Sequence, residues 1–162
     1  MALRGAIWYQ GEANAGRGVA YRVQLERLIT SWRQAFEREL AFYLVQLPNI
    51  MAPWQKPVEE GGWPLIRESF LKTALEVPHT GIAITIDVGE EKDIHPKDKQ
   101  AVGDRLARAA LRQTYGKTGF AWRGPICTAA EFRDGAVRLT FDTGGAPLTS
   151  RGGGDLVGFA LK

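Results

Sequence analysis

Short apolar runs alternate with amphipathic stretches along the first two thirds of the chain. Residues 3–9, 41–47 and 81–87 are almost continuously apolar and are bounded by loop residues, a pattern typical of strands buried on both faces of a sheet. Residues 19–37, 65–76 and 97–115 instead place apolar side chains at helical spacing. Strand and helix therefore alternate over residues 3–115, which predicts an α/β fold with a parallel sheet and helices on both of its faces.

The pattern changes after Gly116. Residues 125–131, 136–142 and 155–161 have the character of short strands, separated by the turn sequences "RDG" and "DTGGAP". This predicts an antiparallel β tail, either packed against the α/β part or belonging to a second β domain. We expect the boundary between the two parts to fall between residues 118 and 119.

Composition argues against several functional classes. The net charge is only +3 and the basic residues are scattered, so we expect neither a nucleic-acid partner nor a membrane surface. No apolar run is long enough for a bilayer span, and the first residues do not have the pattern of a signal peptide. A single cysteine, Cys127 in "GPICTAA", cannot form an internal disulfide and is expected to be a packed thiol. Two histidines without a clear carboxylate set predict no metal site.

Two polar stretches follow predicted strands. Gln10-Gly11-Glu12 comes after the first strand, and residues 87–95 follow the third. Because ligands bind beyond the carboxyl ends of parallel strands, we expect these stretches to meet at one rim of the sheet. The second stretch has His95 beside several carboxylates. A histidine held by a carboxylate is the general-base half of a hydrolytic triad, although a lone histidine before a helix is more often a cap or a surface residue.

The sequences "IWYQGEAN", "TIDVG" and "DIHPKDKQAVGDRLA", in this order, resemble the sialate O-acetylesterase family. This family lies within the SGNH hydrolases and is related to acetylxylan esterases. The resemblance covers residue 3 to about residue 116. It implies a three-layer α/β/α, flavodoxin-like SGNH-hydrolase fold that is incomplete at its N-terminal side. Residues 1–118 would then be part of the catalytic domain, and residues 119–162 a β-rich extension.

The resemblance also implies a reaction and its residues. Family members are carboxylic ester hydrolases that remove acetyl groups from sugar hydroxyls by serine acyl transfer, and they need no cofactor. His95 would be the general base, and Gln10 would donate a side-chain N–H to the oxyanion. Glu12 would orient Gln10 or the loop of the nucleophile. Asp93, two residues before His95, is the first candidate for orienting the imidazole, and Asp87 at the end of the third strand is the alternative.

The nucleophile of the family is the point where the match fails. The family's serine lies in a Gly-Gln-Ser-Asn-like block well upstream of the segment that matches Gln10-Gly11-Glu12. Here the serines are Ser31, Ser69 and Ser150, and none follows a strand with a tight glycine turn. We therefore expect the carboxyl-terminal portion of an esterase, inactive alone, that self-associates through an open sheet edge. The alternative is a non-catalytic module that binds carbohydrate or another partner.

Three further residues are candidates for substrate binding. Trp54 and Trp63 belong to a loop with four prolines, residues 48–64, and either stack on a sugar ring or cover the core. Arg67 matches a family position near the site, where it would contact the substrate or the missing upstream segment, or it is an ordinary exposed helix arginine. Family members are often secreted or periplasmic, and because the sequence has no signal peptide the compartment stays open.

Overall fold

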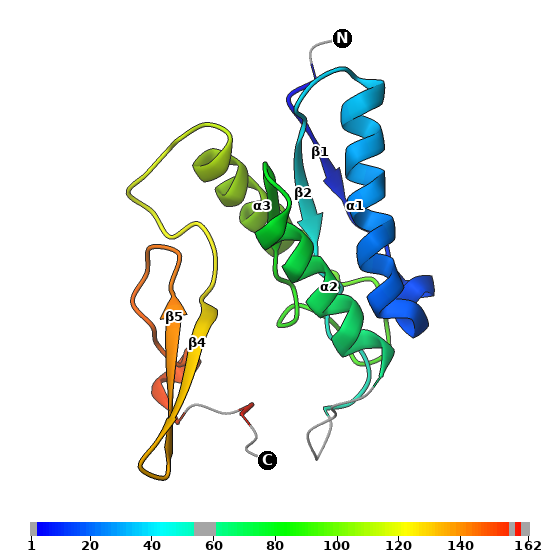
Figure 1. Ribbon diagram of the computed structural model, residues 1–162. Coiled ribbons are helices and arrows are strands. Elements are labelled where there is room, and N and C mark those ends of the chain that lie inside the picture. The colour runs from blue at the N-terminus through cyan, green and yellow to red at the C-terminus, as the bar shows by residue number, and fades with distance from the viewer. Residues whose placement is uncertain (1–2, 54–60, 156–157, 160–162) are drawn as a thin grey trace. The chain divides into compact units, whose positions relative to one another are not determined.

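The computed structural model describes residues 3–53, 61–155 and 158–159. The chain forms two compact units, residues 1–117 and 118–162. Strands and helices alternate in the first unit, as the sequence predicts (Figure 1). Its elements are β1 (Gly5–Trp8), η1 (Glu12–Arg17), α1 (Gly18–Ala35), β2 (Ala41–Val45), α2 (Gly62–Glu76), β3 (Thr80–Ala83) and α3 (Lys99–Gln113).

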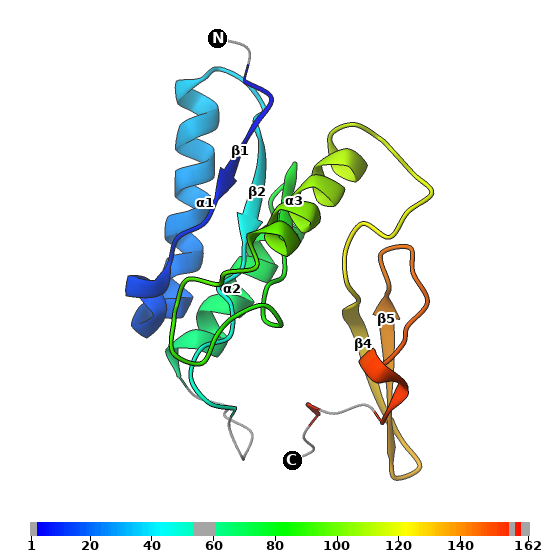
Figure 2. The ribbon, with the colours of Figure 1, turned by 180° about the vertical axis from the view of Figure 1, so that it is seen from behind.

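The three strands of this unit form a parallel sheet in the order β1-β2-β3. Every residue of β2 and β3 is buried, which confirms the interpretation of continuous apolar runs as strands covered on both faces. Alternate side chains of β2 point to opposite faces. Phe42 and Leu44 pack with residues of α1 and α2, and Tyr43 and Val45 pack with residues of α3. The helices thus form a layer on each side of the sheet (Figure 2).

The edge strand β1 departs from the prediction of a buried strand. Its residues Ala6 and Trp8 pack against the core formed with α1 and α2. Ile7 points to the opposite face, where α3 covers β2 and β3, and its side chain is 65% exposed. A groove of about 280 Å³ runs between β1 and α3 and is lined mainly by apolar residues, among them Gly5, Ala6, Ile7, Leu106 and Ala110.

Local differences from the predicted elements have local causes. Residues 12–17, between the first predicted strand and the first predicted helix, form the short 3-10 helix η1. Helix α2 begins at Gly62 rather than at residue 65, and Pro64 fits its first turn, where a missing N–H costs nothing. Strand β3 ends at Ala83, four residues before the predicted end. Beyond it, the main-chain oxygen of Gln46 accepts from the side-chain hydroxyl of Thr85.

The second unit contains an antiparallel hairpin of β4 (Ile126–Arg133) and β5 (Ala136–Asp142), followed by η2 (Arg151–Gly153). Asp134 and Gly135 both have positive φ, 52° and 74°, as a tight two-residue hairpin turn requires. The third predicted strand, residues 155–161, lies largely outside the described residues. The prediction of a packed Cys127 is wrong. Its side chain is exposed because the two-stranded ribbon leaves most of β4 uncovered.

Candidate active site

The loop from residue 84 to residue 98, between β3 and α3, carries Asp93 and His95. The backbone N–H of His95 donates to Asp93 Oδ1 at 2.8 Å, and His95 Nδ1 lies 3.2 Å from the same oxygen. The backbone contact is the turn that an aspartate forms with the second residue after it. The aspartate therefore fixes both the main chain and one ring nitrogen of His95.

The electrostatics of the pair favour an ionised Asp93. The hydrogen bond from the backbone N–H of His95 lowers the pKa of the Asp93 carboxyl below its usual value, and the charge of His95 adds to this effect. The His95 side chain is 76% exposed. With Nδ1 beside the carboxylate, the second ring nitrogen is accessible for proton exchange with a reactant.

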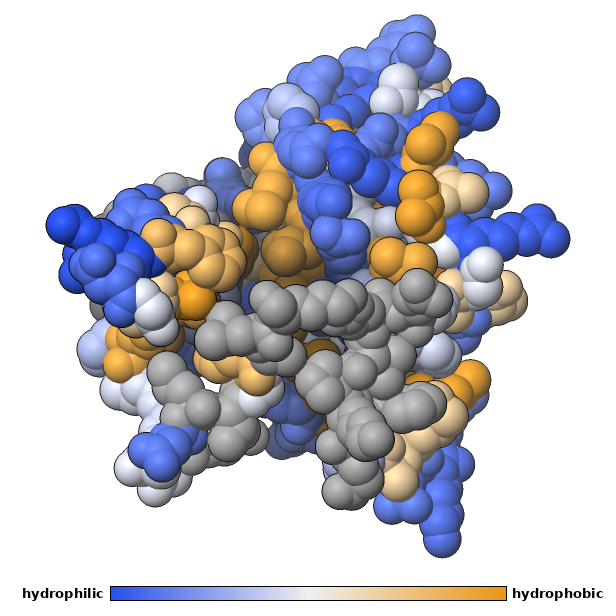
Figure 3. Space-filling model, turned by 60° about the horizontal axis from the view of Figure 1, so that its bottom comes forward, coloured by the Kyte–Doolittle hydropathy of each residue, from blue (hydrophilic) through white to orange (hydrophobic). Residues whose placement is uncertain are grey.

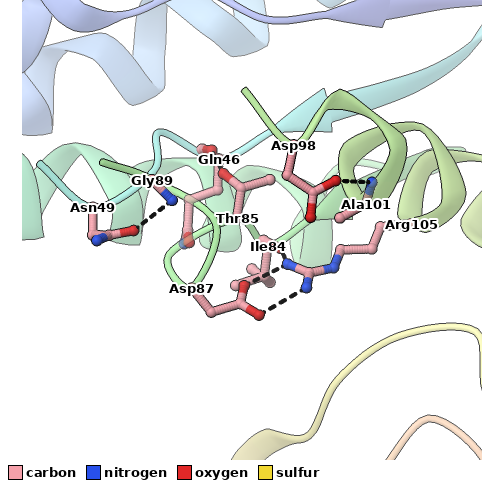
Figure 4. A network of polar contacts seen from close by, with 9 residues as sticks. All are labelled: Gln46, Asn49, Ile84, Thr85, Asp87, Gly89, Asp98, Ala101 and Arg105. Carbon is pink, nitrogen blue, oxygen red and sulfur yellow. Dashed lines mark hydrogen bonds and ion pairs between the residues drawn. The ribbon is translucent and has the colours of Figure 1, made fainter. Parts of the chain in front are cut away.

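Asp87, the alternative orienting residue, is engaged elsewhere (Figure 4). Arg105 Nη2 donates to Asp87 Oδ2 at 2.8 Å, and Nη1 donates to Asp87 Oδ1 and to the main-chain oxygen of Ile84. The hydrogen bond with Asp87 raises the pKa of Arg105. The geometry thus favours Asp93 as the partner of His95 and gives Asp87 a place in the attachment of the loop to α3.

The side chain of Gln10, just after β1, has both ends of its amide engaged. Nε2 donates to Asn14 Oδ1 at 2.9 Å, and the Tyr21 hydroxyl lies 2.9 Å from both Gln10 Oε1 and the Gln10 main-chain oxygen. Tyr21 Oη accepts from Trp8 Nε1 at 3.2 Å. Burial raises the pKa of Tyr21, so its hydroxyl keeps its proton and donates to Gln10. The amide therefore has a fixed orientation, with the second hydrogen of Nε2 available.

Glu12 acts on the backbone of the same segment. Its Oε2 accepts from the backbone N–H of Gly11 at 3.0 Å. Gly11 has φ 146°, and an added Cβ would lie 3.2 Å from Ile66 Cδ1, so both backbone conformation and packing favour glycine. The negative charge of Glu12 also contributes, after burial, to the raised pKa of Tyr9. These contacts support the role of Glu12 in holding the segment that presents Gln10.

One contact connects residues that flank the two predicted polar stretches, Tyr9 before Gln10 and Lys99 beyond His95. The ammonium of Lys99, at the start of α3, lies over the Tyr9 ring at 5.1 Å from its centroid. Among the described residues, the side chains of Gln10 and Glu12 form hydrogen bonds with residues 11–21. The side chains of Asp93 and His95 contact each other. The structure thus brings together Asp93 with His95, and Gln10 with Glu12, as two separate groups at the carboxyl end of the sheet.

A cavity of about 540 Å³ lies between the segment after β2 and the start of α2. Its lining includes Trp63, Arg67, Asn49, Met51, Ile86 and Glu91. Hydrophobic and hydrophilic residues are mixed on the face that Figure 3 displays. Trp54 lies outside the described residues.

Arg67 is half-buried rather than exposed, and burial lowers its pKa. Its Nε donates to the main-chain oxygen of Leu47 at 3.0 Å, Nη2 donates to that of Pro48, and the guanidinium carbon lies 5.6 Å from the centre of the Trp63 ring. Arg67 thus lines the cavity and supports the segment that follows β2.

Sequence reasoning missed Tyr21, Asn49 and Arg105. Tyr21 lies at helical spacing with the apolar residues of α1, so its pattern indicates only core. Asn49 and Arg105 each bind a residue at least eighteen positions away, which no local pattern reveals. Within the described residues no group of three His, Cys, Asp or Glu side chains has the arrangement of a metal site. No helix in the described part is long and apolar enough to cross a bilayer.

The family model "Carbohydrate esterase, sialic acid-specific acetylesterase" matches residues 1–112. The chain belongs to this family. It is 33% identical to sialate O-acetylesterase of Mus musculus over 88% of this chain and 29% of the mouse protein. It is 31% identical to the Homo sapiens protein of the same name, over 87% of this chain and 30% of the human protein. The recognition of the family from the three sequence motifs is therefore confirmed.

The crystal structure of a carbohydrate acetylesterase from Xanthomonas citri matches with a TM-score of 0.86 and 43% identity. The match covers 94% of this chain and 35% of that one. It confirms the expected SGNH-like α/β fold. The chain spans about a third of the length of the esterase-family proteins that it matches.

Proposed function

We propose that this chain contributes the general base and an oxyanion donor of a carbohydrate O-acetylesterase of the sialate or xylan type. The observation that carries the proposal is the contact of Asp93 with both the backbone N–H and Nδ1 of His95, in a chain of an acetylesterase family. The substrate class is an acetyl ester on a sugar hydroxyl, and the reaction needs no cofactor.

The proposed reaction is acyl transfer through a serine. His95 takes the proton of the serine hydroxyl with its second ring nitrogen while Asp93 holds the first. The serine oxygen bonds the acetyl carbon, the bond from that carbon to the sugar oxygen breaks, and His95 returns the proton to the sugar. Water then attacks the acetyl-serine by the same route, which releases acetate and restores the serine.

Gln10 would stabilise the oxyanion of each tetrahedral intermediate. Tyr21 and Asn14 hold its amide, so the donor is preorganised and does not have to be reoriented during the reaction. Loss of one oxyanion donor raises the barrier by about 3–4 kcal/mol in other hydrolases. Glu12 would maintain the backbone that presents Gln10, through its bond to Gly11.

The cavity beside Trp63 is the proposed sugar site. An indole face suits the apolar face of a sugar ring, and Asn49 and Glu91 line the same cavity with polar atoms. Arg67 would contribute by fixing the Trp63 ring that it lies over. The proposal for Trp54 rests on the sequence alone, since that residue is outside the described part of the chain.

No serine of this chain is proposed as the nucleophile. The Ser69 hydroxyl is buried in α2 and donates to Gly18 O at 2.7 Å. Ser150 bonds Gly154 O in the second unit, and Ser31 lies within α1. We therefore expect the isolated chain to be inactive, and the whole-protein activity requires a serine from a further segment.

A second candidate function is carbohydrate binding without hydrolysis. It is favoured by a cavity that contains Trp63, together with the unsuitable positions of the three serines. Sugar binding measured by calorimetry, with no hydrolysis even when a serine-bearing segment is present, would support this alternative over the esterase.

The esterase is tested with a chromogenic acetyl ester. The chain is assayed alone and together with the part of the 43% identical Xanthomonas citri acetylesterase that it does not cover. We expect hydrolysis only in the mixture, and loss of it in His95→Ala. Asp93→Asn should reduce turnover strongly, and Asp87→Asn only weakly. Turnover in the mixture that is unchanged by His95→Ala would reject the proposed function.

A further inference from the structure

The loop that carries Asp93 and His95 is anchored to the rest of the unit on two sides. On one side, Arg105 of α3 binds the Asp87 carboxylate and the main-chain oxygen of Ile84. The side chain of Asp98 caps α3 by accepting from the N–H of Ala101 at 2.9 Å, which fixes the point where the loop ends. Figure 4 shows both contacts.

On the other side, the loop runs beside the segment that follows β2. The backbone N–H of Gly89 donates to Asn49 Oδ1 at 2.7 Å. Ile50 and Glu90 form a parallel bridge, and the N–H of Met51 donates to Glu91 O at 3.0 Å. The two segments thus continue the pairing of the sheet beyond its strands, and the Asn49 side chain bonds the loop backbone within this extension.

The approach at this contact is too close for any side chain on Gly89. A Cβ added there would lie 1.9 Å from the main-chain oxygen of Asn49 and 2.5 Å from its Oδ1. Glycine is therefore required at position 89 by space, and it allows the amide acceptor of Asn49 to reach the loop backbone directly.

Asn49 is itself held firmly. Arg67 of α2 binds the main-chain oxygens of Leu47 and Pro48, the two residues that precede it. Gln46, which is buried, donates its Nε2 to Arg67 O at 3.2 Å. The anchor of the loop is therefore a segment fixed between β2 and α2.

We infer that Asn49 is a positioning residue for His95. It acts through Gly89 and the adjoining backbone pairs, which hold residues 89–91 and thereby set where the Asp93–His95 turn lies at the rim of the sheet. The inference rests on the proposed function, in which His95 is the general base. An uncharged amide supplies the acceptor without placing a further negative charge beside the loop, and the contact needs only an oxygen at that position.

The test compares Asn49→Ala with Asn49→Asp in the full chain by NMR. Asn49→Ala removes the acceptor, and Asn49→Asp retains an oxygen in its place. In Asn49→Ala, amide exchange of Gly89 should be about 10-fold faster, since one hydrogen bond is lost. Backbone order parameters of residues 90–95 should fall from about 0.85 towards 0.6. Asn49→Asp should restore both. The amide of Gln46, bonded to Ala83 O in the sheet, reports on general destabilisation and should not change.

Unchanged order of residues 90–95 in Asn49→Ala would overturn the inference, whatever the enzymatic activity. The second readout is kcat in the acetyl-ester assay of the completed mixture, which we expect to be lower in Asn49→Ala and to recover in Asn49→Asp. If the loop loosens in Asn49→Ala but no variant, nor the wild type, hydrolyses the ester, the role of Asn49 in holding the loop is supported. That result counts only against the proposed function.

Discussion

Asp93 binds His95 twice, through the backbone N–H at 2.8 Å and beside Nδ1 at 3.2 Å. The hydrogen bond from the backbone N–H of His95 is the largest cause of the lowered pKa of the Asp93 carboxyl, and the imidazole lowers this pKa by a smaller amount. The pair is therefore preformed by the local turn, and the contact of the carboxylate with Nδ1 does not depend on a bound substrate.

The first prediction concerns the pH dependence of this turn. Because the pKa of Asp93 is lowered in the folded chain, its contribution to stability is complete above the ordinary Asp pKa of about 3.9 and is lost as the pH falls through the lowered value. The carboxyl carbon shift of Asp93, followed by NMR during an acid titration, measures that value directly.

The control for this titration is His95→Ala. An alanine keeps the backbone N–H, which is the largest cause of the shift, so the pKa of Asp93 should stay below the ordinary range while losing part of its depression. A full return to the ordinary value in His95→Ala would mean that the imidazole, rather than the turn, is responsible.

The layered sheet is predictable from sequence because its three strands lie in almost continuously apolar runs and each helix has one apolar face. The degree to which each strand is buried cannot be predicted from sequence in the same way. Residues 3–9 have the same apolar character as residues 41–47, yet Ile7 of β1 is exposed. The other edge strand, β3, is buried because α3 packs against β2 and β3. An apolar run indicates which residues form a strand, whereas its place in the sheet depends on which other segments pair with it.

The site is predictable only in part, for a similar reason. The turn of Asp93 with His95 is local, so the spacing in "DIH" already contains it. The contact of Asn49 with Gly89 joins residues forty positions apart, and it depends on how two loops leave adjacent strands. Sequence motifs therefore identify the candidate site residues more readily than the residues that hold them.

The second prediction is a steric effect at Gly89. Gly89→Ala should destabilise the fold by about 1–3 kcal/mol, since its Cβ would meet the main-chain oxygen of Asn49 at 1.9 Å. The matched control is Gly103→Ala in α3, where no atom lies within 4 Å of the added Cβ. That variant should be stabilised by about 0.5–1 kcal/mol through helix propensity. Urea unfolding of both variants measures the difference, and equal effects would contradict the argument.

The third prediction concerns the support of Gln10. Tyr21→Phe removes a buried hydroxyl that bonds both Gln10 and Trp8, so it should lower the free energy of unfolding by about 1–3 kcal/mol. Tyr115→Phe, at a side chain that is 55% exposed, is the control and should have little effect. The side-chain amide signals of Gln10 in an NMR spectrum should shift in Tyr21→Phe alone. Unaltered Gln10 signals would show that Tyr21 does not orient this amide.

The fourth prediction concerns the open face of β1. In the described sheet β1 pairs with β2 on one side, and its other edge has main-chain groups free to pair with another strand. Because Ile7 is 65% exposed beside an apolar groove, we propose that the isolated chain self-associates through this edge.

Light scattering coupled to size-exclusion chromatography should give a mass above 17.9 kDa. Ile7→Lys should restore the monomer mass, because its charge would lose water on association. The control Val19→Lys, at an equally exposed apolar position on α1, should leave the larger mass unchanged. A monomeric wild type, or equal masses for the two lysine variants, would reject this interface.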